Sequence, residues 1–232
     1  MRHLLQLPIA LLIFSCSSPG GDPGTHTDPG STVTAPPASA NTADDRDRTM
    51  KPEVLIGMMS DDLTGVTVAD LFAGDGYFTF KLIAAGANVI AIVNDEAEAE
   101  GINARKRELG LGDDRLMVRA VPVGDPGLAP EEADMALIVH HFTLIKDRMN
   151  YFKLMRNGLR FPRPLFMIEW QYREMQQGPP LSQRLPSEKI MDMVGAMGYS
   201  DVGAHSDKIP DQVVFAINDY YDPYGDPATE GQ

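Results

Sequence analysis

The chain of 232 residues has a single cysteine, Cys16, and a single tryptophan, Trp170. One cysteine cannot form an intramolecular disulfide, and no later residue can supply a thiolate to zinc or a thiol nucleophile to a catalytic site. Basic residues are fewer than acidic ones, which gives a formal net charge of −13. Because nucleic-acid binding depends on Lys and Arg that neutralise phosphates, this balance disfavours DNA or RNA as a partner. The sequence predicts no metal site.

The N-terminal apolar run, residues 4–14, is too short for a membrane-spanning helix, which needs about 20 apolar residues. It follows the positive charge of Arg2 and leads into residues 13–16, Ile-Phe-Ser-Cys, which resemble a bacterial lipobox. We therefore predict a lipoprotein signal peptide at residues 1–16, with Cys16 as the lipidated residue. This anchor would hold an exported protein in the bacterial cell envelope, at the periplasmic face or in the outer membrane. The alternative is an accidental apolar N-terminus on a cytosolic protein.

Large apolar side chains are also lacking in residues 17–48, where Val33 is the only large aliphatic residue and Gly, Pro, Ser, Thr and Asp dominate. Such a segment cannot bury enough apolar surface to offset the entropy lost on ordering, so we predict a disordered tether. Residues 221–232 predict a flexible tail. Residues 49–220 then form one domain, long enough for a sizeable core.

The domain is organised around residues 66–96. Residues 66–69 have the β-branched density of a buried strand, a helix is expected from Tyr77 to a stop at Gly86, and residues 89–93 predict a second buried strand. The turn between the first strand and the helix is rich in glycine. Glycines there let backbone N–H groups approach a ligand at a helix N-terminus, which favours an anionic group.

Only Gly74 and Gly76 occupy this turn, and Phe78 and Thr79 stand where a dinucleotide-binding fold would have its third glycine. The nicotinamide and flavin cofactors are therefore disfavoured.

Strands and helices alternate through the rest of the domain. This alternation predicts an α/β fold with a mostly parallel sheet covered on both faces. In such a sheet, ligands bind at the carboxyl ends of the strands, where the strand order reverses. We expect helices at residues 52–59, 96–109, 147–157 and 187–197, strands at 116–121, 134–140 and 165–169, and an antiparallel pair at 202–205 and 212–217.

Several motifs occur in the order found in class I S-adenosylmethionine (SAM)-dependent methyltransferases, which the chain resembles over residues 49–219. They are Asp70 with Gly74 and Gly76, then residues 77–79, residues 134–139, Gly178-Pro179-Pro180 followed by Arg184-Leu185, and Gly198-Tyr199. The resemblance implies a Rossmann-like methyltransferase sandwich whose seven-stranded sheet ends in an antiparallel hairpin. It also implies SAM as cofactor and methyl transfer to a small-molecule substrate. The residues that would surround the methionine portion of SAM are Asp70, Ala73, Gly74 and Gly76.

The chain departs from the family pattern after the next two strands. The family ends the second strand with an acid that binds the ribose hydroxyls, whereas Val93 stands here, so Asn94 and Asp95 are the candidates for this contact. Asp95 has an alternative role as the cap of the next helix. After the third strand the family places an acid facing the adenine, whereas this chain has Pro122, which lacks a donor and a side-chain acceptor.

His140 and His141 follow the fourth strand, in a stretch where the family that the chain resembles has polar residues and a histidine pair, although that pair falls at the positions of Thr143 and Leu144 here. Either imidazole could act as a general base, since imidazole titrates near neutral pH. The alternative is one buried structural histidine and one surface histidine. Trp170, after the fifth strand, lines the substrate pocket or covers the sheet edge.

Two functions follow. The first is SAM-dependent methyl transfer to a small molecule, with cofactor affinity reduced by Val93 and Pro122. The second is a non-catalytic, exported binding module that kept the fold, because a fold does not dictate a function.

Overall fold

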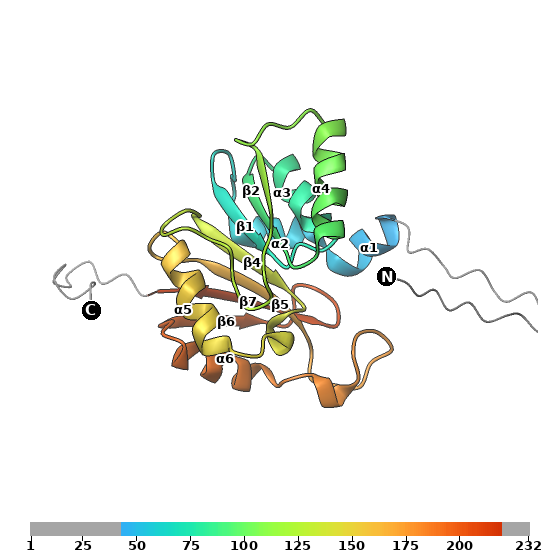
Figure 1. Cartoon of the computed structure of the whole chain (residues 1–232). Coiled ribbons are helices and arrows are strands. Elements are labelled where there is room, and N and C mark those ends of the chain that lie inside the picture. Colours follow the sequence, from blue (N-terminus) through green and yellow to red (C-terminus); the bar gives the residue numbers. More distant parts are fainter. Residues whose placement is uncertain (1–42, 220–232) are drawn as a thin grey trace, which may run out of the picture. The chain divides into compact units, whose positions relative to one another are not determined.

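The computed structural model describes residues 43–219 (Figure 1), so the predicted signal peptide with Cys16, most of the predicted tether and the predicted tail lie outside the described residues. The described chain forms one seven-stranded sheet in the order β3-β2-β1-β4-β5-β7-β6. Strands β1 to β5 are parallel, and β7 runs antiparallel to both β5 and β6. The predicted α/β sheet with a C-terminal antiparallel pair is confirmed. The strands are β1 Thr67–Leu71, β2 Asn88–Val93, β3 Leu116–Ala120, β4 Met135–Val139, β5 Leu165–Trp170, β6 Asp201–His205 and β7 Gln212–Asn218.

Helices cover both faces of the sheet (Figure 1), because the central strands are apolar on both sides. In β2, Ile90 and Ile92 face α5 and α6, whereas Val89, Ala91 and Val93 face α2, α3 and α4. None of the helices in the described part of the chain is long and apolar enough to cross a membrane. The helices are α1 Ala43–Met50, α2 Pro52–Met59, α3 Tyr77–Ala84, α4 Glu96–Glu108, α5 Arg148–Gly158 and α6 Ser187–Ala196.

Helix α1 corrects the predicted start of the domain. The sequence places residues 43–48 in a disordered tether, but they form the helix α1 beside α3. Polar contacts hold its middle, where Tyr77 Oη donates a 2.6 Å hydrogen bond to Asp47, which also pairs with Lys81, and Arg46 pairs with Asp75. The last residue of the helix, Met50, is buried in the core. The sequence gives no sign of this helix, because its charged residues have partners about 30 positions later and show no apolar periodicity of their own.

A buried ion cluster joins the end of β7 to the end of α5. Asp219 is 8% exposed and accepts two hydrogen bonds from Arg156, at 2.9 and 3.0 Å, and one from Arg163, at 2.7 Å. Its backbone amide also donates to the carbonyl of Pro162 at 2.8 Å. One carboxylate thus holds two guanidinium groups, and both would lack an acidic partner without it.

We expect Asp219→Ala to lower the free energy of unfolding by about 2–3 kcal/mol, because it leaves two partly buried arginines without a counter-charge. Urea unfolding followed by circular dichroism measures the change. Asp192→Ala, at an exposed position of α6, is the matched control and is expected to stay within about 0.5 kcal/mol of the wild type. Equal effects of the two substitutions would contradict the structural role of Asp219.

Candidate functional site

The loop between β1 and α3 is closed on one side and open on the other. Phe72, Gly74 and Gly76 all have left-handed backbones, with φ of 62°, 56° and 78°. A Cβ at Gly76 would lie 3.0 Å from both Phe80 and Ile102, so packing requires this glycine. A Cβ at Gly74 would meet only the carbonyl oxygen of Phe72, at 4.0 Å. Gly74 therefore leaves space where the backbone can approach a ligand.

Asp70 and Ala73 fix this loop to its surroundings. The Asp70 side chain is buried at the end of β1 and accepts a 2.6 Å hydrogen bond from the Thr79 hydroxyl, in the first turn of α3. The Ala73 amide donates to the carbonyl of Ile92, at 2.8 Å, which joins the loop to β2. Burial raises the pKa of the Asp70 carboxyl to about 6, although the Thr79 hydrogen bond opposes the shift.

A stack of rings spans the point where the strand order reverses, between β1 and β4. Phe72 follows β1 and His141 follows β4, and their ring centroids lie 4.7 Å apart with an interplanar angle of 6°. The other neighbour of Phe72 is Tyr151 of α5, at 5.5 Å. A phenylalanine with a left-handed backbone costs about 1 kcal/mol relative to glycine, so the ring stack holds a strained residue in place.

The polar residues after β2 bond within the protein. Asn94 Nδ2 donates to the carbonyl of Val121 at the end of β3, at 3.0 Å. Asp95 is exposed and accepts a 2.6 Å hydrogen bond from the Ala97 amide, which confirms its alternative role as the cap of α4. Asn94 Oδ1 and Asp95 Oδ2, which bond to none of the described residues, are the remaining acceptors here.

His140 is held in one orientation by Gln212, which is fully buried in β7. Gln212 Nε2 donates to the Thr49 carbonyl of α1 at 2.9 Å, and its Oε1 therefore faces His140 Nε2, at 3.0 Å. This geometry places the proton of His140 on Nε2 and leaves Nδ1 as an acceptor. His140 has a left-handed backbone, φ 55°, so β4 ends one residue earlier than the sequence predicts. Burial lowers the pKa of His140 to about 4, so the ring is neutral at physiological pH.

Glu169 is a site residue that the sequence analysis missed. It lies in β5 with 4% of its surface exposed, and it accepts a 2.8 Å hydrogen bond from the Phe142 amide. Burial raises the pKa of Glu169 to about 7, although the Phe142 amide and Arg148 oppose the shift. The signal for this residue is an acid inside the apolar strand Leu-Phe-Met-Ile-Glu-Trp, since carboxylates are seldom buried without a reason.

Two cavities flank Trp170. The indole stacks on His140, with centroids 4.4 Å apart, and the backbone of Gly178 lies against it, so closely that a Cβ there would be 2.6 Å from the ring. One cavity, of about 680 Å³, lies between this pair and α1. The other, of about 500 Å³, is lined by His140, Glu169 and Trp170 together with Thr143, Leu144, Pro179, Gln183 and Arg184.

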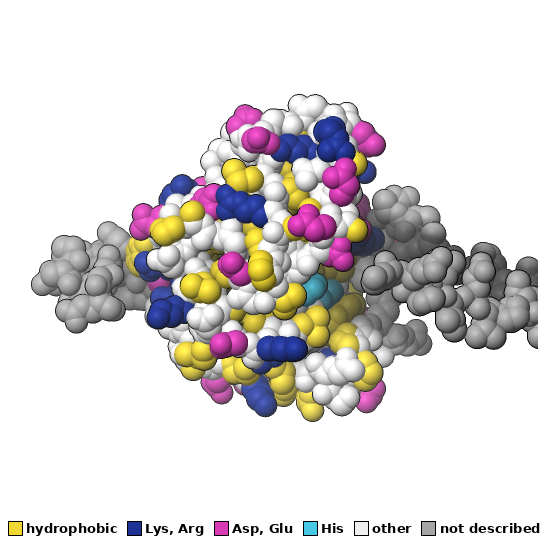
Figure 2. All heavy atoms as spheres, viewed as in Figure 1, with side chains coloured by type: hydrophobic (Ala, Val, Ile, Leu, Met, Phe, Trp, Pro, Cys, Tyr) yellow, Lys and Arg dark blue, Asp and Glu magenta, His cyan; other side chains and the backbone are white. Residues whose placement is uncertain are grey.

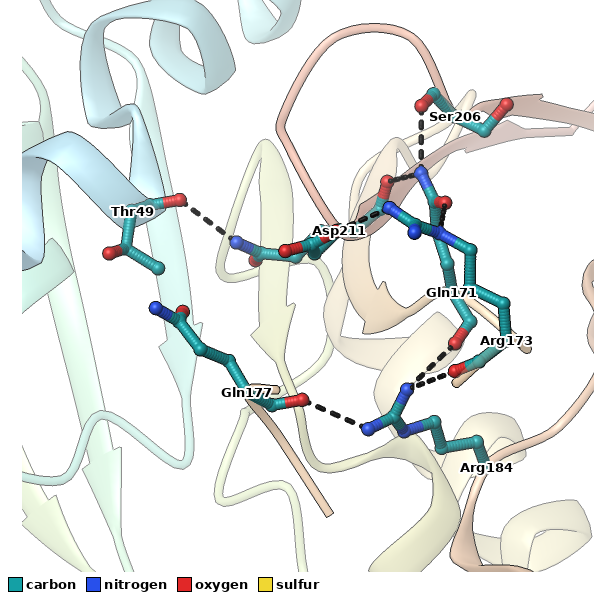
Figure 3. Close-up of polar contacts among 8 residues, drawn as sticks. Thr49, Gln171, Arg173, Gln177, Arg184, Ser206 and Asp211 are labelled. Atoms are coloured by element: carbon teal, nitrogen blue, oxygen red, sulfur yellow. Dashed lines mark hydrogen bonds and ion pairs between the residues drawn. The ribbon is translucent and has the colours of Figure 1, made fainter. Parts of the chain in front are cut away.

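Arg184 lines the second cavity and holds the loop beside it by hydrogen bonds to backbone carbonyls, several of which Figure 3 shows. Its guanidinium group donates to the backbone carbonyls of Pro179 (2.7 Å), Arg173 (2.7 Å), Gln177 (2.9 Å) and Gln171 (3.3 Å). These bonds gather the loop 171–184 around one side chain. The loop therefore keeps its place beside Trp170 without regular secondary structure of its own, apart from the short 3₁₀ turn Leu181–Gln183.

These residues fit the methionine part of SAM better than its adenosine part. The open backbone at Gly74, beside the N-terminus of α3, suits a carboxylate. The ribose and adenine would meet the Asn94 oxygen and Pro122, which is exposed and offers no donor.

Figure 2 shows a histidine side chain reaching the surface among hydrophobic side chains, on a face where acidic and basic groups are interspersed. Among residues 43–219, no group of three His, Cys, Asp or Glu could hold a metal ion.

Ionising Asp70 is expected to destabilise the fold. Burial raises its pKa from 3.8 to about 6, so the folded state binds this proton more tightly than the unfolded chain. The contribution of Asp70 is therefore most favourable below about pH 4, falls as pH rises to about 6, and above that costs about 2–3 kcal/mol. We expect Asp70→Asn to be more stable than the wild type by about 1–2 kcal/mol at about pH 7.5, with the gain vanishing near pH 4.

Urea unfolding of both proteins at several pH values measures this gain. Because Glu169 and His140 are present in both proteins, their effects cancel when the two free energies of unfolding are subtracted, and the effect of Asp70 remains. Asp192→Asn, at an exposed position, is the control and is expected to show no such difference. A gain for Asp70→Asn that stays constant with pH would contradict the raised pKa.

The tautomer of His140 is a second testable feature. We expect nitrogen-15 NMR at neutral pH to find His140 protonated at Nε2 and His141 protonated at Nδ1, because His141 Nδ1 lies 2.8 Å from the Val139 carbonyl. In Gln212→Leu, His140 is expected to become a mixture of tautomers, whereas His141 stays unchanged and acts as the internal control. Protonation of His140 at Nδ1 in the wild type would refute the Gln212 contact.

The sequence matches no protein-family model and no curated protein. The fold, in contrast, is similar to many solved structures. A SAM-dependent methyltransferase from Aquifex aeolicus is 18% identical, with a TM-score of 0.66 over 75% of this chain and 91% of that chain. Geranyl diphosphate methyltransferase in complex with SAM is 16% identical, with a TM-score of 0.59 over 79% and 92%. The [4+2]-cyclase SpnF is 16% identical, with a TM-score of 0.58 over 69% and 62%. At these identities the likeness establishes the fold, which is that of the SAM-dependent methyltransferases.

Proposed function

We propose that this domain binds SAM at the carboxyl end of β1 and transfers its methyl group to a small molecule held beside Trp170. The observation that carries this proposal is the loop at Gly74, which is open towards a ligand although it is firmly held by Asp70 and Ala73. The fold of the methyltransferase structures supports it.

The roles of the residues follow from their positions. SAM supplies an electrophilic methyl group when it is bound. The Gly74 backbone and the α3 N-terminus would hold the methionine carboxylate, and Asn94 Oδ1 would accept a hydrogen bond from the ribose. The pKa of His140 is too low for an effective base at neutral pH. Its neutral ring instead orients the substrate that receives the methyl group, by accepting a hydrogen bond on Nδ1. Glu169, whose pKa is about 7, takes up the proton that the acceptor loses.

We further propose that the protein works outside the cytosol. The apolar run with Arg2 and the lipobox-like residues 13–16 support export and lipid attachment through Cys16. The N-terminal lipid would keep the domain at the membrane surface of the bacterial envelope.

A non-catalytic binding module is the second candidate. Two observations favour it: one carboxylate oxygen of Asp95 caps α4, and the Asn94 amide donates to the Val121 carbonyl. Without an acid for the ribose, SAM loses contacts of about 1.5–3 kcal/mol each. The cavities beside Trp170 would then serve a ligand with no methyl transfer.

Calorimetric titration with SAM and S-adenosylhomocysteine decides between the two functions. We expect the wild type to bind both, and Gly74→Ala to bind at least about tenfold more weakly, because the new methyl group occupies the open side of the loop. Gly110→Ala is the matched control: Gly110 also has a left-handed backbone, φ 63°, with no atom within 4 Å of an added Cβ, and it follows α4 instead of β1.

The two substitutions carry the same backbone strain, so only Gly74→Ala is expected to affect SAM. If the wild type gave no heat up to millimolar SAM, methyl transfer would be abandoned in favour of the binding module. Equal binding by Gly74→Ala and the wild type would place SAM elsewhere.

A further inference from the structure

The cavity beside Glu169 has a buried positive charge without a carboxylate partner. Arg184 is 6% exposed, and its hydrogen bonds among the described residues go to four backbone carbonyls. An arginine has five N–H donors, so one, on Nη2, bonds to none of the described residues. Carbonyl dipoles stabilise a guanidinium group but do not neutralise it, and buried charges are normally paired with an opposite charge.

A second guanidinium group bonds to the backbone of Thr143, one of the residues that line the cavity. Arg148 donates to the carbonyls of Phe142 (2.8 Å) and Thr143 (2.7 Å), and in the described part of the chain it forms no ion pair within 4.0 Å. Arg184 therefore brings a positive charge to a cavity that also holds the Glu169 carboxyl, in a chain whose formal net charge is −13. A local charge opposite to that of the whole chain favours an anionic ligand at this point of the surface.

The rest of the cavity has an apolar side. Leu144, Trp170 and Pro179 line it together with Arg184. A volume of about 500 Å³ suits a small molecule. The cavity thus combines an apolar wall, a guanidinium group and the carboxyl group of Glu169.

We propose that this cavity binds a small amphiphilic oxyanion, whose carboxylate or phosphate lies against Arg184 and whose apolar body lies against Leu144 and Pro179. If the proposed function holds, this anion is the molecule that receives the methyl group, and its nucleophilic group is directed to Glu169. The binding step needs no cofactor, so it can be measured by itself.

Benzoate is a suitable probe, and its neutral isostere benzamide is the comparison. Trp170 is the only tryptophan of the chain and lines both this cavity and the one beside α1, so its fluorescence reports binding in either, and the substitutions below tell the two cavities apart. We expect benzoate to change this fluorescence saturably and with at least about tenfold higher affinity than benzamide, because only benzoate gains a charge-assisted bond to Arg184. Arg184→Gln is expected to abolish this preference.

Arg184 also holds the loop 171–184, so its loss could disturb the cavity wall. Gln183→Glu avoids this problem, because Gln183 is exposed, lines the cavity and changes only in charge. We expect it to weaken benzoate binding about three- to fivefold. Gln177→Glu is the matched control: its side chain extends away from Arg184 (Figure 3) and lines the cavity beside α1, so benzoate affinity is expected to stay within about twofold.

Two results would overturn the proposal: equal affinity for benzoate and benzamide, or equal effects of Gln183→Glu and Gln177→Glu. If benzoate binds as expected and SAM does not bind, the anion cavity stands and methyl transfer falls. If SAM binds and benzoate shows no preference over benzamide, the cofactor site stands and the acceptor is not an anion of this kind.

Discussion

The reversal of strand order between β1 and β4 determines where this domain can act. Right-handed crossovers carry the chain from β1 to β2 over one face of the sheet and from β4 to β5 over the other, so the loops after β1 and β4 separate. The space between them is left without a crossing connection. Here Phe72 and His141 meet across it with stacked rings, and the polar groups gather on either side, with Asp70 and Gly74 towards β2, and His140 and Glu169 towards β5.

The fold was accessible from the sequence because each strand and helix carries its own apolar pattern. Strand β2 is apolar on both faces and bounded by Gly86 and Asn94, so local reasoning places it correctly. Helix α1 has no such pattern, and the side chains that hold it, Tyr77 and Lys81, lie in another helix. The sequence therefore does not predict elements whose stability depends on contacts distant in the chain.

The same distinction separates the parts of the candidate site. The glycine turn with Asp70 is a local motif, and the sequence reveals it. The orientation of His140 depends on Gln212, 72 residues later, and no spacing rule connects the two. Glu169 differs from His140, because an acid inside an apolar strand can be recognised from the sequence without knowledge of any distant partner. A buried ionisable residue in a strand is thus worth a functional hypothesis even without a motif around it.

Helix α1 is attached to the domain in two ways that respond differently to ionic strength. Its first turns are held by Arg46 and Asp47, whose ion pairs lie between partly exposed side chains, and mobile ions screen such pairs. Its last turn is held by the bond from buried Gln212 to the Thr49 carbonyl and by the buried Met50 side chain, and neither contact carries a net charge that dissolved ions could screen. Added salt would therefore fray this helix from its N-terminal end and leave its C-terminal turn docked. The histidine that shares Gln212 would keep its orientation while the wall of the cavity beside α1 loosens.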